Sequence, residues 1–168
     1  NGPGKRFCIW VQGCMKNCPG CFNPETHALD KGYSVDVNDL YKQLLGTEGI
    51  EGISISGGEP MLQAAALCHF LEMVRRSTPL SVVMFSGWTT GEINGNPEAK
   101  RLKGLVDILI SGPYIKELSI DRPLQSSSNQ EVEFLTNRYT VHDVESVWPL
   151  EVVIAEDGTI IQSGIMHI

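Results

Sequence analysis

The chain has 168 residues, the size of one ordinary domain, and its 13 basic and 20 acidic side chains give a net charge of −7. This acidity excludes nonspecific binding to duplex nucleic acid, which needs positive charge to displace counterions from phosphates. The apolar runs are too short to span a bilayer, and no charged and apolar leader opens the chain. We therefore expect one soluble, cytoplasmic domain over residues 1–168, without membrane or nucleic-acid partners; Asn1 in place of Met suggests a trimmed N-terminus.

The first two-thirds of the sequence predict alternating strands and helices. Short runs rich in β-branched and aromatic residues predict buried strands over 7–11, 50–56, 80–85 and 106–110. Apolar residues at helical spacing predict helices over 37–45, capped by Asp36 or Asn38, over 62–76, and from Asn96-Pro97 to about 104. Such alternation is typical of parallel βα units, and four strands are too few to close an eight-stranded barrel. We expect an α/β fold, either an open partial barrel or a parallel sheet with an added hairpin.

The last third of the sequence gives fewer signals. Residues 111–130 predict an irregular segment, and residues 133–139 predict a strand. The turn Glu156-Asp157-Gly158, between apolar runs at 150–154 and 159–162, predicts a C-terminal β-hairpin.

Three of the five cysteines lie in a Gly-, Pro- and Asn-rich loop over 12–24, as Cys14, Cys18 and Cys21 with the spacing C-x3-C-x2-C. An odd number of cysteines crowded into one loop is a poor disulfide framework and indicates metal ligands. A fully ligated [4Fe–4S] cluster normally takes four cysteines, so three would leave one iron without a protein ligand. An open coordination position is typical of a metal centre that performs chemistry.

Two other metal sites stay open at this point. His27 would complete a Cys3His zinc site, although zinc sites usually pair two knuckles far apart in the sequence. A fourth ligand from Cys8 or Cys68 would instead give an electron carrier. Cys8 lies in the first predicted strand and Cys68 in the second predicted helix, so we expect both thiols to pack in the core.

A glycine-rich turn, Gly57-Gly58-Glu59-Pro60, ends the second predicted strand and precedes a helix. Two glycines let the backbone approach a ligand closely, and a carboxylate beside them can bind an ammonium group. The carboxyl ends of strands are where open α/β folds bind ligands. The turn therefore predicts a ligand site, or otherwise a tight connection between strand and helix.

A C-x3-C-x2-C loop followed one βα unit later by Gly-Gly-Glu-Pro resembles the radical S-adenosylmethionine (SAM) superfamily. Further stretches are similar to the activating proteins of anaerobic ribonucleotide reductase, namely Asn1-Gly2-Pro3-Gly4 and residues 9–14, 18–24, 85–89, 106–109, 112–114 and 128–130. The resemblance implies a truncated βα barrel of the radical SAM type with a C-terminal β-hairpin. The family's usual first strand, before Asn-Gly-Pro-Gly, is missing from this sequence.

The resemblance also implies an oxygen-sensitive oxidoreductase whose [4Fe–4S] cluster is held by Cys14, Cys18 and Cys21. SAM would bind the fourth iron and contact Gly20, Phe22, Ser56, Gly57, Gly58, Glu59 and Ser86. An electron from a flavodoxin or ferredoxin-type donor would split SAM into methionine and a 5′-deoxyadenosyl radical. In activases that radical removes hydrogen from a glycine of a partner glycyl-radical enzyme, and the resemblance implies anaerobic ribonucleotide reductase as such a partner. No catalytic side chain is expected beyond the cluster and SAM.

The sequence departs from the activase pattern at two places, both in segments expected to face a substrate or partner. Ser111 stands where activases often have aspartate, and residues 124–127 stand where an Arg-Gly pair precedes Ser-Asn-Gln. A glycyl-radical activase is the first hypothesis, because a short chain leaves an open mouth that a large partner would cover. The departures favour a second, a radical SAM enzyme that modifies a small molecule or peptide. A non-catalytic iron–sulfur or zinc module is the third.

For two residues in or beside the cysteine loop we expect no functional role. We expect Lys16 to be a solvent-exposed loop lysine and Trp10 to pack in the core.

Overall fold

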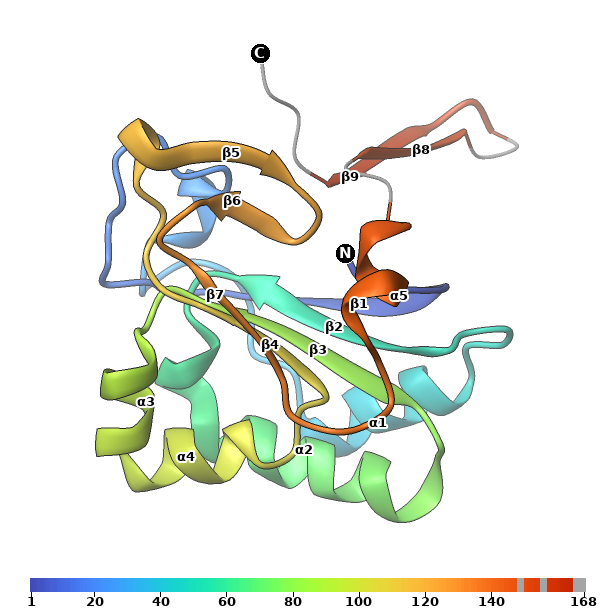
Figure 1. Ribbon diagram of the computed structural model, residues 1–168. Helices are drawn as coiled ribbons and strands as arrows, with labels where there is room; N and C mark the ends of the chain where they lie inside the picture. Colours follow the sequence, from blue (N-terminus) through green and yellow to red (C-terminus); the bar gives the residue numbers. More distant parts are fainter. Residues whose placement is uncertain (148–149, 155–156, 165–168) are drawn as a thin grey trace.

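The computed structural model describes residues 1–147, 150–154 and 157–164, and its main sheet has the strand order β1-β2-β3-β4-β7 (Figure 1). The parallel strands are β1 (Arg6–Val11), β2 (Gly52–Gly57), β3 (Ser81–Ser86) and β4 (Ile108–Ser111). Strand β7 (Glu131–Phe134) pairs antiparallel with β4 at one edge. The predicted α/β class, with a mostly parallel sheet, is confirmed.

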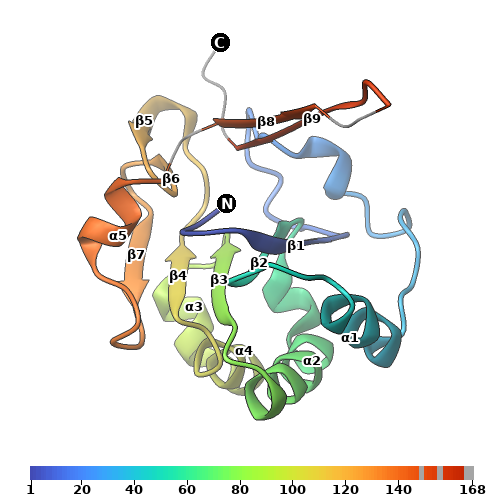
Figure 2. The same ribbon diagram turned by 90° about the vertical axis from the view of Figure 1, so that its right-hand side faces the viewer.

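Helices cover one face of this sheet, and the opposite face carries a hairpin and a short helix (Figures 1 and 2). The covering helices are α1 (Val37–Leu45), α2 (Ala64–Ser77), α3 (Thr90–Gly95) and α4 (Pro97–Lys103). The opposite face carries the β5 (Ser119–Arg122) and β6 (Gln125–Ser127) hairpin and α5 (Val141–Glu145). Single 3-10 turns are η1 (Pro24–Thr26), η2 (Pro60–Gln63) and η3 (Lys116–Leu118). No helix in the described part of the chain has the length and apolarity that a bilayer crossing requires.

Two of the three predicted helix starts are confirmed in detail, whereas the helix predicted from residue 62 begins at Ala64, after η2. Asp36, one of two candidate caps, accepts a hydrogen bond from the Asn38 backbone N–H at 2.8 Å and starts α1. The Asn96 side chain caps α4, and Pro97 occupies its first position. The predicted C-terminal hairpin is also present, as β8 (Leu150–Ile154) and β9 (Ile160–Gly164). Glu156 of its predicted turn lies outside the described residues.

Four segments differ from the prediction. The irregular segment over 111–130 contains the β5–β6 hairpin, and the strand predicted over 133–139 runs instead over 131–134. The chain leaves the sheet after Phe134, where the Thr136 hydroxyl donates to the Asp107 carboxylate at 2.7 Å. Helices α3 and α5 were not predicted because they are short; each is stabilised by a capping box, Thr89 with Glu92 and Thr140 with Asp143.

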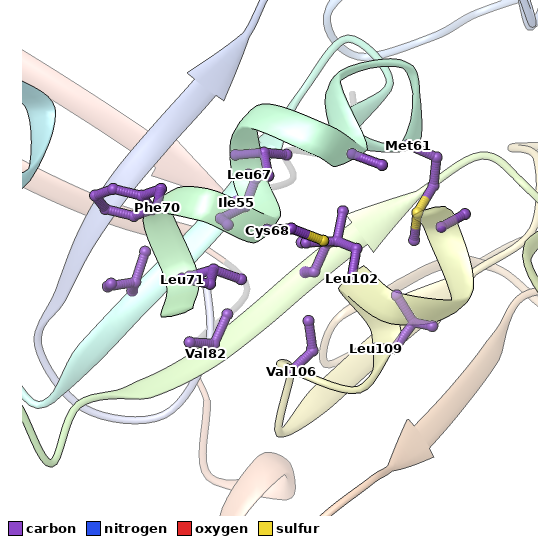
Figure 3. Close-up of a cluster of buried hydrophobic side chains, with 14 of the residues drawn as sticks. Ile55, Met61, Leu67, Cys68, Phe70, Leu71, Val82, Leu102, Val106 and Leu109 are labelled. Atoms are coloured by element: carbon purple, nitrogen blue, oxygen red, sulfur yellow. The ribbon is translucent and has the colours of Figure 1, made fainter. Parts of the chain in front are cut away.

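The main hydrophobic core lies between the sheet and its helices. Figure 3 shows Leu71 of α2 beside Val82 of β3, and Phe70 of α2 and Leu102 of α4 belong to the same core. Cys68 is buried there, as predicted. The expectation for Cys8 is wrong, because this thiol is exposed. Strand β1 is an edge strand whose alternate residues pack on the core, and Cys8 belongs to the other set.

A second apolar cluster covers the opposite face of the sheet. Val83 of β3 and Ile108 and Ile110 of β4 point to this side, where Leu124 of the β5–β6 turn and Val144 of α5 pack on them. Because side chains alternate along a strand, both faces of β3 and β4 are apolar. The second cluster therefore fixes the hairpin and α5 above the carboxyl half of the sheet.

Asp107, 3% exposed, joins β3, α2 and the segment after β7, because its carboxylate accepts hydrogen bonds from the Val82 N–H, Arg75 and Thr136 at 2.7, 2.8 and 2.7 Å. Burial opposes ionisation, but these bonds outweigh it and hold the pKa of Asp107 below 3.8. Asp107→Ala is expected to lower the free energy of unfolding by about 3–5 kcal/mol, since buried donors lose their acceptor. Urea unfolding followed by circular dichroism measures this loss.

The pH dependence gives a second measurement on the same variant. A carboxyl group whose pKa is lower in the folded than in the unfolded state stabilises the fold at pH values above its unfolded-state pKa. This stabilisation is lost as the pH falls through the folded-state pKa. The wild type should therefore lose more stability than Asp107→Ala below about pH 4. Asp39→Ala, which breaks an exposed pair with Lys42, should change stability by less than about 0.5 kcal/mol. Equal acid sensitivity of wild type and Asp107→Ala would contradict this assignment.

Candidate functional site

The cysteine loop follows β1 and is fastened to the fold at its entry. The Gly13 N–H donates to the Thr26 carbonyl at 2.8 Å, and the Cys14 N–H donates to the His27 carbonyl at 3.0 Å. The Glu59 N–H donates to the Gly13 carbonyl at 2.8 Å, which ties the loop to the glycine-rich turn. The start of the cysteine loop therefore lies beside the glycine-rich turn.

The three loop cysteines are all partly buried and line one cleft. Burial raises the pKa of Cys21, and the neighbouring Cys18 and Cys14 add to this, whereas a hydrogen bond from the Asn23 N–H lowers it. In the described part of the chain, no three His, Cys, Asp or Glu side chains converge as a single metal ion requires. A cubane cluster makes no such demand, because each thiolate binds a different iron atom.

The glycine-rich turn leaves β2 directly against the loop. A β-carbon at Gly57, which has φ +99°, would lie 2.6 Å from the Val11 carbonyl oxygen. A β-carbon at Gly58 would lie 2.4 Å from the Gly13 carbonyl oxygen. Both glycines are therefore required by the close approach of the chain's own backbone, and they also line the cleft.

The carboxylate of Glu59 is 1% exposed and is held by three donors. Oε1 accepts hydrogen bonds from the Met61 N–H at 2.9 Å and the Ser86 hydroxyl at 2.7 Å. Oε2 accepts from the Gly87 N–H at 2.7 Å. Burial raises the pKa of Glu59 although these bonds oppose the shift. Glu59 thus joins the glycine-rich turn to the end of β3.

The structure brings the predicted site residues together at the carboxyl ends of β1, β2 and β3. The residues that line the common cleft are Cys14, Cys18, Cys21, Phe22, Ser56, Gly57, Gly58, Glu59 and Ser86. Gly20 lies outside this lining and faces Lys116 and Tyr114. Its φ of +75° explains the glycine, because it turns the chain between Cys18 and Cys21.

Sequence reasoning missed several residues of the cleft. Trp10 was expected in the core, but it is 49% exposed and lines the cleft, because it shares the open face of β1 with Cys8. The rings of Tyr114 and Phe22 have centroids 5.0 Å apart. Tyr114 could have been found from its place just after β4, since strand ends meet at one edge of a parallel sheet. Leu124 and Arg122 reach the cleft from the unpredicted β5–β6 hairpin.

The two departures from the activase pattern lie in different surroundings, one on the helical side of the sheet and one in the cleft. Ser111, expected to face a substrate or partner, is 1% exposed and contacts the Thr90 hydroxyl of α3 at 3.2 Å on the helical side. Strand alternation explains this, because Ile110 takes the cleft side of the sheet. Ser126 does line the cleft. Its backbone N–H and hydroxyl both donate to the Gln130 side-chain oxygen at 2.9 Å.

The fold and the cleft define an α/β protein with a three-cysteine site at the carboxyl ends of parallel strands. Residues 1–133 match the family described as the 4Fe-4S single cluster domain, and the chain belongs to that family. The anaerobic ribonucleoside-triphosphate reductase-activating protein of Vibrio cholerae serotype O1 is 32% identical over 145 residues, which cover 81% of this chain and 92% of that protein.

Two further relatives are similar over comparable lengths. The anaerobic ribonucleoside-triphosphate reductase-activating protein of Escherichia coli K12 is 27% identical over 80% of this chain and 92% of its own length. The pyruvate formate-lyase-activating enzyme of Listeria monocytogenes serovar 1/2a is 26% identical over 92% of this chain and 64% of its own length. The resemblance to activating proteins that the sequence indicated is confirmed by these matches.

Proposed function

We propose that this chain is a radical SAM enzyme that activates a glycyl-radical enzyme. The observation that carries the proposal is that one cleft brings together three loop cysteines, the Gly-Gly-Glu turn and Ser86. The named relatives activate anaerobic ribonucleoside-triphosphate reductase or pyruvate formate-lyase, which supports a partner of that kind.

The donor set fits a [4Fe–4S] cluster with an open iron. Cys14, Cys18 and Cys21 come from one short loop and face one cleft, so they would hold three irons on one side. When bound, the reduced cluster supplies one electron that splits SAM into methionine and a 5′-deoxyadenosyl radical, which takes a hydrogen atom from the target. An electron donor of the flavodoxin or ferredoxin type belongs to this proposal.

The protein's own contribution is to orient the cofactors and keep water away. In this proposal Gly57 and Gly58 present backbone atoms to the methionine end of SAM, beside Ser56 and the Glu59 side chain. Phe22, with Gly20 beside it, borders the nucleoside, and the Tyr114 ring supports Phe22. These residues would hold the sulfonium of SAM beside the cluster, which would make electron transfer to it effectively intramolecular.

Part of the cleft wall is apolar, beside the polar side chains of Arg122 and Ser126. Phe85, Leu124 and Val147 line it and belong to, or pack against, the second hydrophobic cluster. The apolar part of the wall suits a reaction in which a reactive radical must meet its target before any other hydrogen donor.

The proposed architecture is a truncated βα barrel of the radical SAM type, formed by a single domain over residues 1–168. The parallel strands β1 to β4 follow each other in the sheet in sequence order, as they would in part of a βα barrel. The cleft side of β1, the edge strand, exposes Cys8 and Trp10. A large partner could cover this open side and deliver a glycine to the cleft.

Anaerobic reconstitution with iron and sulfide, followed by dithionite and SAM, tests the proposal. We expect 5′-deoxyadenosine and methionine in equal amounts. Addition of a partner glycyl-radical enzyme should give a glycine-centred doublet by electron paramagnetic resonance. A chain that binds the cluster but forms no 5′-deoxyadenosine would be a non-catalytic iron–sulfur module.

A second candidate is a radical SAM enzyme that modifies a small molecule or a peptide. Ser126, which lines the cleft in the segment that lacks the family's Arg-Gly pair, is the observation that favours it. Ser111 adds no support, since it faces α3. Radical chemistry that proceeds to a modified product without a partner polypeptide would establish this candidate and contradict the activase.

A further inference from the structure

Three segments of the cleft meet at Gly87, just after β3. The Gly87 N–H donates to Glu59 Oε2 of the glycine-rich turn. A β-carbon at Gly87 would lie 3.3 Å from that oxygen and 3.3 Å from Cγ of Lys16, in the cysteine loop. The stem of Lys16 therefore packs on the same backbone that Glu59 holds.

The ammonium group of Lys16 reaches past Gly87 to α3. Nζ lies 2.7 Å from Oε1 and 2.9 Å from Oε2 of Glu92. The Lys16 side chain is 26% exposed, compared with 75% for Lys42, which pairs with Asp39 in its own helix. The expectation of an ordinary exposed loop lysine is therefore wrong.

The Glu92 carboxylate is held by hydrogen bonds within its own helix as well as by Lys16. Oε2 accepts hydrogen bonds from the Thr89 N–H at 2.7 Å and the Thr89 hydroxyl at 3.0 Å, within the capping box of α3. The hydrogen bond from Lys16, with those from Thr89, lowers the pKa of Glu92 to about 2, so Glu92 is ionised at neutral pH. Little side-chain freedom is lost when Lys16 binds a carboxylate held in this way.

We infer that Lys16 and Glu92 are positioning residues that anchor the cysteine loop to the β3–α3 turn. Lys16 lies between Cys14 and Cys18, and Gly87 follows Ser86 at the end of β3 and bonds Glu59, so the anchor would hold the cluster ligands in place beside the glycine-rich turn. The inference rests on the proposed function for its purpose, but the anchor itself concerns residues of this chain.

The anchor also places a balanced pair of charges beside the cysteine loop. Loss of Lys16 leaves the negative charge of Glu92 uncompensated, which disfavours the reduced, more negative cluster. Loss of Glu92 leaves a positive charge, which favours it. The reduction potential should therefore fall in Lys16→Met, rise in Glu92→Gln and return towards the wild-type value in the double variant.

The test uses the full chain in both cluster-free and reconstituted forms. Hydrogen exchange of the cluster-free chain, read on peptides from residues 12–23, should be about fivefold faster in Lys16→Met and Glu92→Gln, because a partly exposed ion pair contributes up to about that factor. Titrations monitored by electron paramagnetic resonance then give the potentials. Lys16→Arg should keep wild-type behaviour, since a guanidinium also binds a carboxylate through two bonds.

Glu72→Gln is the matched control, because Glu72 pairs with Arg101 on the helical side, outside the cleft lining. It should change neither loop exchange nor potential. Unchanged loop exchange in Lys16→Met, or potentials that move in the same direction in both single variants, would overturn the anchor. Both readouts are independent of SAM cleavage, so failure of the proposed function, seen as absent 5′-deoxyadenosine, stays distinguishable.

Discussion

Replacement of Cys18 by serine is expected to lower reductive SAM cleavage by more than about 100-fold, because loss of the partners that merely orient metal ligands already costs 10–100-fold. Cys18 lies in the cleft beside Cys14 and Cys21, and no second set of thiols is available in the described residues that line it. The measurements are 5′-deoxyadenosine formation with dithionite and iron bound per chain after anaerobic reconstitution. Both should fall together, whereas the fold, followed by circular dichroism, should be retained.

Cys8→Ser is the matched control for this prediction. Cys8 is exposed on β1 and lies outside the cleft lining, so its removal should leave iron content and SAM cleavage unchanged. Loss of the cluster in Cys8→Ser, with activity unaffected in Cys18→Ser, would show that the cluster ligands were assigned wrongly. Such a result would favour a cluster held by Cys8, Cys14 and Cys21, whereas loss of iron in both variants would favour a cluster with four protein ligands and an electron-transfer role.

The cysteine loop and the glycine-rich turn could be predicted from sequence because each is a local pattern whose residues follow within a few positions. Their meeting in space also followed, because both come directly after parallel strands, whose carboxyl ends share one edge of the sheet. The same reasoning placed Ser86 at the site, because Ser86 is the last residue of β3.

The face on which a strand residue lies could not be predicted in the same way. Trp10 was expected in the core although β1 was predicted as a strand, and Ser111 was expected just after the strand over 106–110, facing a substrate or partner, whereas it is the last residue of β4 and faces α3. A strand that is apolar on both faces, as β4 is, carries no alternation from which to read its orientation. The register with the neighbouring strands decides it, and that register depends on contacts distant in sequence.

The β5–β6 hairpin escaped prediction for a related reason. Its turn, Pro123-Leu124, places Leu124 at φ +64°, a conformation that usually selects glycine or asparagine. Burial of the Leu124 side chain against Val83 and Ile110 offsets this backbone cost. A turn stabilised by distant packing leaves no turn signature in its own residues.

Removal of the Glu59 side chain is expected to damage both stability and cofactor binding. Glu59→Ala leaves the buried Met61 N–H, the partly buried Gly87 N–H and the Ser86 hydroxyl without their acceptor, which should lower the free energy of unfolding by about 3 kcal/mol. The end of β3 would also lose its tie to the glycine-rich turn, so SAM affinity should fall about tenfold or more, since orienting partners of this kind contribute 10–100-fold. Urea unfolding of the cluster-free chain and equilibrium binding of SAM to the reconstituted chain give the two values.

Ser86→Ala separates the contribution of the carboxylate from that of one hydrogen bond. It removes one of the three donors to Glu59 and leaves the carboxylate in place, so the stability loss should be about 1 kcal/mol. If Glu59→Ala is no less stable than Ser86→Ala, the carboxylate does not join the two segments. If Glu59→Ala is destabilised but binds SAM as tightly as the wild type, Glu59 serves the fold without ordering the cofactor site.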